Sequence, residues 1–192
     1  MKRRISIILL LFNLSFSQEI IGEGLYGDDL ILFLRENYKT SFTLGYADAR
    51  DTLYLQIERH DGEIKGVYSN FSVNLPNGAD PSTHLYENGI NCEHVWPQSL
   101  YEGSEPQKSD MHALRPCKDN VNSARGNKPF NDIIDSQTTT WYWEENQMSN
   151  IPSSNIDEYS ENHDSYFEPR EDRKGDVART IFYFYVMYSE VS

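Results

Sequence analysis

Residues 91–99 place a carboxylate directly beside an imidazole, as Glu93 and His94, shortly before Trp96-Pro97. A carboxylate is a hard oxygen ligand suited to Mg²⁺ or Ca²⁺. An imidazole can act as a general base on water because its pKa lies near neutrality. The pair could therefore activate a water molecule beside a bound ion. On the alternative interpretation, Glu93 is a solvated acid at the end of a strand and His94 is an ordinary core histidine.

The surrounding elements decide whether these two side chains can serve one site. Adjacent side chains of a regular strand point to opposite faces, so the two can meet at a site only where the strand ends or is distorted. Pro97 lacks an N–H donor and restricts the residue before it, which predicts a short strand over 89–95 that ends here. A polar loop, a second short strand and a short helix are expected to follow, over 98–109, 111–115 and 118–126.

Helical and extended patterns alternate along the rest of the chain. Apolar spacing predicts helices over 28–38, 47–58 and 172–189. Strands are predicted over 63–73 and 141–145, and loops over 74–88 and 151–164. In the last helix the apolar face is expected to comprise Val177, Ile181, Tyr185 and Tyr188, an aromatic stripe that should lie in the core rather than bind a ligand. The sequence predicts an α+β fold in one domain.

The N-terminal residues have the layout of a secretory signal. Lys2, Arg3 and Arg4 precede an apolar run over 5–16, and small residues stand at the end of that run, before Gln18. The run is shorter than the roughly 20 residues that span a bilayer. We therefore predict a signal peptide over 1–17, a mature domain over 18–192, no membrane partner, and a secreted or periplasmic location.

Composition argues against simple electrostatic binding of a polyanion. The chain has 17 Lys and Arg against 30 Asp and Glu, a formal net charge of −13, and residues 1–17 contain no acid, so the mature domain is more acidic still. Non-specific nucleic-acid binding normally depends on basic side chains. Any phosphate chemistry would need a bound cation to supply local positive charge.

Cys92 and Cys117 are the two cysteines of the chain. Two thiols in an exported protein favour one disulfide between them. The alternative is a structural zinc module that uses Cys92, His94, His112 and Cys117 as its four ligands.

Several ordered motifs resemble the bacterial endonuclease I and secreted-ribonuclease family, which are nucleases of the ββα-metal or His-Me finger type. Three of them surround Glu93 and His94: EHVWP at 93–97, DMHALRP at 110–116 and VNSARGN at 121–127. The remainder lie further away, with ADARDTLYLQI at 47–57, VYSNFSVNLP at 67–76 and FEPREDRKGDVARTIFYFYVMY at 167–188. The resemblance covers most of the chain and implies a ββα finger surrounded by helices.

The family's roles can be carried onto the matching positions. The resemblance implies His94 as the general base, with Glu93 and Asn122 as ligands of one divalent ion. Mg²⁺ is the expected ion, with Ca²⁺ or Mn²⁺ as alternatives. Water would attack phosphorus in line and leave 5′-phosphate and 3′-hydroxyl ends. Arg125 would clamp a phosphate or be a surface charge of the helix, and His112 would orient His94 or pack against it.

Three departures from the family pattern keep a non-catalytic alternative open. Ala113 stands where relatives often carry Asn or His, and the loop over 98–109 lacks their arginine. The chain also ends at Ser192, where relatives continue with an R-N-P-F tail. The expectation is a monomeric, metal-dependent, largely sequence-non-specific endonuclease acting on DNA, RNA or both. A catalytically inactive nuclease fold that binds a partner is the alternative.

Overall fold

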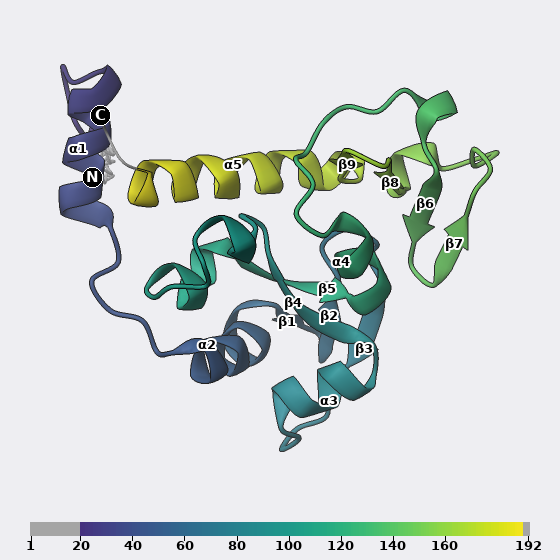
Figure 1. Cartoon of the computed structure of the whole chain (residues 1–192). Helices are drawn as coiled ribbons and strands as arrows, with labels where there is room; N and C mark the ends of the chain where they lie inside the picture. Colours follow the sequence, from purple (N-terminus) through teal and green to yellow (C-terminus); the bar gives the residue numbers. More distant parts are fainter. Residues whose placement is uncertain (1–19, 190–192) are drawn as a thin grey trace, which may run out of the picture.

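The computed structural model describes residues 20–189, so the predicted signal peptide over 1–17 lies outside the described residues. Within this range there are helices of several kinds and nine short strands (Figure 1). The α-helices are α1 (Gly27–Tyr38), α2 (Tyr46–Thr52), α3 (Pro81–Glu87), α4 (Asp119–Arg125) and α5 (Glu171–Tyr188), and α2 continues into the π-helical turn η1 (Leu53–Ile57). The 3₁₀ turns are η2 (Gln98–Leu100), η3 (Gln107–Ser109), η4 (Met111–Ala113), η5 (Asp135–Gln137) and η6 (Ile156–Glu158).

The strands form three small antiparallel sheets in the described part of the chain. Strands β1 (Arg59–His60), β2 (Glu63–Lys65) and β3 (Ser72–Asn74) form one, and β4 (Ile90–His94) and β5 (Leu114–Lys118) form a two-stranded ribbon. The third has the order β7-β6-β8-β9, from β6 (Thr140–Trp143), β7 (Asn146–Met148), β8 (Ser160–Asn162) and β9 (Phe167–Glu168). This mixture of helices with separate antiparallel sheets confirms the predicted α+β class.

The ribbon and the helix that follows it occupy the middle of the molecule. Strand β4 pairs with β5 from Ile90 opposite Lys118 to His94 opposite Leu114, and α4 begins directly after β5. The second strand was expected to stop before Pro116, but β5 runs through it. A strand residue directs its N–H and C=O to the same side, and the carbonyl of Pro116 accepts a bond from Val67 N (2.8 Å), outside the ribbon. The missing donor of Pro116 therefore faces away from β4 and costs the ribbon no hydrogen bond.

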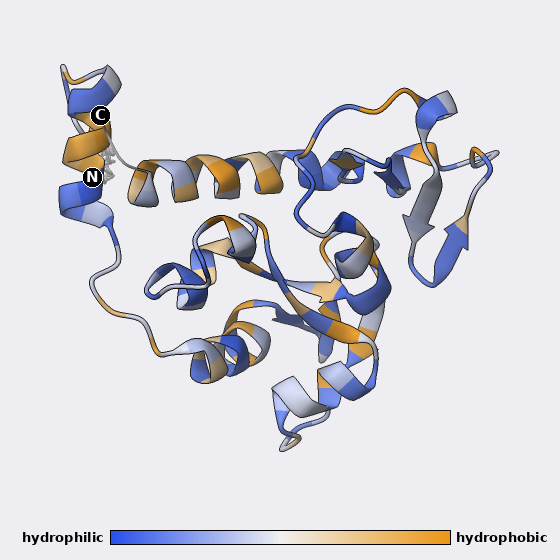
Figure 2. Cartoon of the chain, viewed as in Figure 1, coloured by the Kyte–Doolittle hydropathy of each residue, from blue (hydrophilic) through white to orange (hydrophobic). Residues whose placement is uncertain are grey.

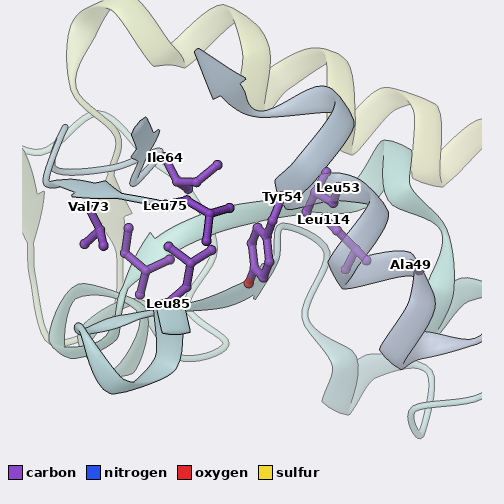
Figure 3. Packing of buried hydrophobic residues seen from close by; sticks show 9 residues of the cluster. Ala49, Leu53, Tyr54, Ile64, Val73, Leu75, Leu85 and Leu114 are labelled. Atoms are coloured by element: carbon purple, nitrogen blue, oxygen red, sulfur yellow. The ribbon is translucent and has the colours of Figure 1, made fainter. Parts of the chain in front are cut away.

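Two hydrophobic clusters pack on the two faces of the ribbon. The first joins α2, η1, the β2–β3 hairpin and α3, and takes Ile90 and Leu114 from the ribbon (Figure 3). The second takes Val95 and Cys117 and adds Val121 of α4 and Val177 of α5. The ribbon is thus held from both sides, which fixes the direction of every side chain at the end of β4.

The register of the ribbon contradicts the predicted disulfide. Cys117 lies opposite Asn91, whereas Cys92 lies opposite Pro116. Residues opposite one another share a face, and neighbours along a strand alternate, so the two cysteines point to opposite faces of the ribbon. Both are free thiols, Cys92 against the first cluster and Cys117 within the second. The same geometry keeps the two sulfurs from sharing one tetrahedral zinc site.

Helix α5 crosses the molecule from the four-stranded sheet at its N-terminal end to α1 at its C-terminal end (Figure 1). Its buried residues are Val177, Thr180, Phe184 and Met187. The predicted stripe is confirmed at Val177 and in part at Ile181, which packs against the second cluster. It is wrong at Tyr185, which is exposed, whereas Phe184 beside it is buried. In Figure 2 the N-terminal end of α5 is hydrophilic and apolar residues recur over the rest of the helix, where some of them are left in contact with solvent.

Two further segments differ from the sequence-based expectation. The predicted loop over 74–88 contains α3, whose start is stabilised by Asp80, because its carboxylate accepts a bond from Thr83 N (2.8 Å) and Pro81 occupies the first turn. The predicted strand over 63–73 is divided into β2 and β3 by a loop over 66–71. No described helix is long and apolar enough to cross a membrane.

Candidate active site

The end of β4 brings Glu93 and His94 to one pocket from opposite faces of the ribbon. Glu93 is on the face covered by α4, and His94 is on the face covered by α2. The strand ends at His94, and a pocket of about 460 Å³ opens there. Its lining includes both side chains and Asn122 from α4, together with Cys92, Pro97, Gln98, Ser99, Gly126 and Asn127. The structure therefore brings the predicted base and the predicted metal ligands to one pocket.

Glu93 is a buried carboxylate held from two sides. Its Oε1 accepts a hydrogen bond from the Tyr68 hydroxyl (2.7 Å) and lies 3.1 Å from Nη1 of Arg125. Burial raises the pKa of Glu93 to about 7, and it outweighs the lowering effects of the Arg125 charge and the Tyr68 hydrogen bond. Both contacts fall on one oxygen, so Oε2 makes no side-chain hydrogen bond with any described residue and is available to a ligand.

His94 is oriented by the backbone of a distant loop. Its Nε2 lies 3.0 Å from the carbonyl oxygen of Lys108, and because a carbonyl only accepts, Nε2 must carry the proton. The Tyr46 ring stacks on the imidazole at 5.3 Å. Nδ1 has no hydrogen-bond partner among residues 20–189 and is the nitrogen that can accept a proton. Burial lowers the pKa of His94, so the ring is neutral at pH 7 and has the protonation state of a base.

Asn122 lies in the second turn of α4 with its amide fixed. Its Nδ2 donates to Oδ1 of Asn91 (2.6 Å), a neighbour on β4. This bond uses the nitrogen and leaves the carbonyl oxygen without a hydrogen-bond partner in the described part of the chain. The amide is therefore oriented by the same strand that carries Glu93.

The oxygen donors around this pocket fit a hydrated divalent ion. Glu93 Oε2 and Asn122 Oδ1 are hard ligands from two rigidly paired elements, and Mg²⁺ is usually held by one or two protein oxygens plus waters and phosphate. Among the described residues there is no group of three or more His, Cys, Asp and Glu placed to hold a metal ion. Two oxygen ligands and an otherwise open shell suit Mg²⁺ better than zinc, which prefers four nitrogen or sulfur ligands.

Arg125 faces the protein interior and is only 1% exposed. Its Nη2 donates to the Val95 carbonyl (2.7 Å), and Nη1 lies 3.1 Å from both the His94 carbonyl and Glu93. The interpretation as a surface charge of the helix is therefore wrong. These contacts also favour a positioning role, in which Arg125 ties α4 to the end of β4, over the direct phosphate contact expected from the sequence.

We expect Arg125→Met to destabilise the protein by about 3 kcal/mol at pH 7, because it leaves the buried Glu93 carboxylate without its charged partner. Urea denaturation would measure the loss. Arg179→Met is the matched control, since Arg179 is an exposed arginine paired with Asp176 on the surface of α5, and such pairs contribute little. The double variant Arg125→Met/Glu93→Gln should recover part of the stability. If Arg125→Met were no worse than the control, the positioning role would be wrong.

His112 is separated from the pocket and points elsewhere. Its side chain is 68% exposed, Nδ1 lies 2.8 Å from Asp110, and the ring packs on Tyr183 of α5 at 4.8 Å. No contact to His94 is present among the described residues, so the structure gives no support to the expected role of orienting His94. The hydrogen bond to Asp110 raises the pKa of His112.

Asp110 is the buried centre of this second network. Its Oδ2 accepts hydrogen bonds from the hydroxyls of Tyr183 (2.7 Å) and Tyr188 (2.6 Å), and its Oδ1 accepts from His112. Burial alone would raise the pKa of Asp110, but these hydrogen bonds outweigh it and leave the pKa below its usual value. The network fastens α5 to the segment before β5.

We therefore expect Asp110→Asn to lower the stability at pH 7 by about 1–3 kcal/mol. A carboxylate whose pKa is lowered by folding stabilises the protein fully above its unfolded-state pKa, and this contribution is lost as the pH falls through the lower folded-state pKa. The gap between wild type and Asp110→Asn should first widen as the pH falls through the raised pKa of His112, and then narrow in stronger acid as Asp110 becomes protonated. Denaturation curves at several pH values test this, and a gap that failed to narrow in strong acid would contradict it.

Three residues that complete the site were not identified from the sequence. Tyr68 comes from the loop over 66–71, which packs so closely on β5 that a Cβ on Gly66 would lie 3.0 Å from Lys118 N. Tyr46 begins α2, and Lys108 contributes only its carbonyl. A buried tyrosine and a backbone oxygen leave no distinctive pattern, so sequence spacing could not reveal them.

The protein has an α+β fold with a ββα unit formed by β4, β5 and α4, and this unit places a histidine, a carboxylate and an amide at one pocket. The chain belongs to the endonuclease I family, because the family model described as Endonuclease I matches residues 28–192. This match confirms the resemblance drawn from the motifs.

Two relatives of this chain share the name extracellular ribonuclease. The extracellular ribonuclease of Bacillus subtilis (strain 168) is 37% identical over 173 residues, which cover 87% of this chain and 52% of that protein. The extracellular ribonuclease of Bacillus amyloliquefaciens is 38% identical over 100 residues, 51% of this chain and 29% of that protein. The chain thus spans about half the length of the first of these relatives, and the matched part of the second is shorter.

Proposed function

We propose that this protein is a secreted, divalent-metal-dependent endonuclease that hydrolyses phosphodiester bonds of DNA, RNA or both. The observation that supports this most is the neutral His94, whose unprotonated Nδ1 shares a pocket with the free oxygens of Glu93 and Asn122. Family membership and the relatives named extracellular ribonucleases support the same activity.

In the proposed mechanism, His94 accepts a proton at Nδ1 from the attacking water. The Lys108 carbonyl holds Nε2–H, and the Tyr46 ring fixes the plane of the imidazole. Glu93 and Asn122 would hold the divalent ion, which when bound stabilises the charge that develops on the phosphate and on the leaving oxygen. Tyr68 and Arg125 keep Glu93 in place. In-line attack leaves 5′-phosphate and 3′-hydroxyl ends.

The ion also reconciles this function with an acidic chain. A formal net charge of −13 repels a polyanion, so phosphate must be attracted locally rather than by the whole surface. We further propose that residues 1–17 direct export and that the mature protein acts as a monomer, outside the cell or in the periplasm.

Cleavage assays test the proposal directly. Plasmid DNA and a structured RNA are incubated with the mature protein in Mg²⁺, then with excess EDTA. We expect cleavage that EDTA abolishes and that Mg²⁺ restores. Absence of cleavage under all conditions, with nucleic acid still bound, would instead support an inactive nuclease fold that acts as a binding protein.

A further inference from the structure

A second pocket, larger and more apolar, adjoins the catalytic one. It measures about 700 Å³ and lies between the N-terminal half of α5, the segment after β4 and the loop over 127–132. Most of its wall is apolar, and its larger members are Trp96, Leu100, Phe130, Val177, Ile181 and Phe182. The proposed mechanism makes no use of this pocket.

The two pockets are neighbours. Pro97 and Asn127 line both of them, and Pro97 follows the proposed base His94 by three residues. A polynucleotide whose phosphate lay in the catalytic pocket would therefore bring one of its nucleosides to the mouth of the apolar pocket. This closeness to the catalytic pocket favours a part of the substrate as the ligand.

The aromatic rings around the pocket differ in how much of their surface is free. Trp96 stacks one face on Phe184 (5.1 Å, 11° between planes), and the Arg125 guanidinium covers Phe130 at 4.5 Å. Phe182 makes no such ring contact among the described residues and is 70% exposed. It is the ring on which a flat ligand can stack.

The polar groups at the pocket suit a neutral ligand that forms hydrogen bonds. Asn127 and Asn131 are exposed amides, which can donate to and accept from the edge of a base. Among the charged groups, Lys174 lies 2.5 Å from Glu168 and 3.7 Å from Asp132, so these charges are paired. Lys128 donates to the neutral amide of Asn162 (2.6 Å) and keeps its positive charge at the edge of the pocket.

We propose that this pocket binds one unpaired nucleobase of the substrate, next to the phosphate that is cut. The inference rests on the proposed nuclease function. A base has an apolar face for Phe182 and polar edges for the two amides, and stacking on an aromatic ring accepts every base. A base in a duplex must first leave its stack and its partner, at a cost of a few kcal/mol. The protein therefore cuts single-stranded segments faster than duplex.

Phe182→Ala tests the stacking. Its side chain is exposed, so the fold should survive, and Ala178→Trp on the same helix should fill the pocket instead. On a short single-stranded oligonucleotide in Mg²⁺, we expect either variant to raise KM roughly 5- to 100-fold, the range of one base–aromatic stack. Tyr185→Ala is the matched control, because Tyr185 is an exposed aromatic residue of α5 that does not line the pocket. An unchanged KM in both pocket variants would overturn the proposal.

A binding measurement distinguishes failure of this proposal from failure of the proposed nuclease function. Fluorescence anisotropy is measured for His94→Ala with a short oligothymidine in Mg²⁺, and with an abasic oligomer of the same length and charge. We expect the abasic oligomer to bind at least several-fold more weakly, and Phe182→Ala in this background to remove the difference. Equal affinity for the two oligomers, or binding of neither, would refute the base pocket. Failure of the nuclease function would appear separately, as wild type that cuts no substrate.

Discussion

His94→Ala is expected to reduce the rate of phosphodiester cleavage roughly 10²- to 10⁴-fold, the usual contribution of a general base. The side chain supplies the one unprotonated imidazole nitrogen in the pocket, and no other histidine lines it. The fold should survive, because the side chain's hydrogen bond is a single contact to the Lys108 carbonyl. Initial rates on single-stranded and duplex substrates, with circular dichroism to verify folding, measure both effects.

His60→Ala is the control for that substitution. His60 is exposed at the end of β1 and does not line the catalytic pocket. It should cut at the rate of wild type. If His94→Ala retained near-wild-type activity, or if His60→Ala lost as much, the base would have to be sought elsewhere in the chain.

The local part of the site could be predicted from the sequence. Glu93 and His94 lie at the end of one strand of the ribbon, Asn122 lies on the helix that directly follows the other strand, and Pro97 comes just after the end of the first strand. A carboxylate, an imidazole and an amide in this order also match the family motifs. The structure brings these three side chains to one pocket, because neighbouring elements and a proline determine where they meet.

The predictions that the structure contradicts concern which face of a strand or helix a residue occupies. Whether Cys92 and Cys117 share a face is decided by a one-residue change in register, and the sequence does not state the register. The face of α5 that becomes buried depends on what packs against it, and for this reason Tyr185 was expected in the core but is exposed. Arg125 was expected either to clamp a phosphate or to be a surface charge, because nothing in its spacing reveals the three backbone carbonyls that accept its hydrogen bonds.

The expectation that His112 orients His94 is not supported by its contacts, for a different reason. His112 belongs to the motif over 110–116, which runs into strand β5 of the ribbon. A role beside His94 was therefore expected. The turn η4 that precedes β5 directs His112 instead toward Asp110 and Tyr183. A residue of a family motif can therefore stabilise the packing of a helix instead of contributing to the active site, and only its contacts show which of these roles it has.

Asn122→Ala should shift the Mg²⁺ dependence of cleavage rather than remove activity outright. Loss of one of the two protein oxygens should lower the affinity for the ion by at least about ten-fold, since even the loss of a residue that only supports a ligand lowers metal affinity 10- to 100-fold. Activity should then return at higher Mg²⁺ concentration. Rates measured across a Mg²⁺ titration give the midpoint for each variant.

A substitution at Asn122 tests where the ion binds more clearly than a substitution at Glu93 does. Glu93→Gln should also lower the affinity for the ion, but it leaves the buried charge of Arg125 unpaired. A change in activity could then come from lower stability as well as from lower metal affinity. Asn122→Ala removes one bond to Asn91, and Ser123→Ala, next to it on α4, is the matched control because its hydroxyl bonds only to the helix backbone. A midpoint that moves for Asn122→Ala but not for Ser123→Ala locates the ion at this pocket. If neither midpoint moves, the ion is held by other groups, and Glu93 is buried for structural reasons alone.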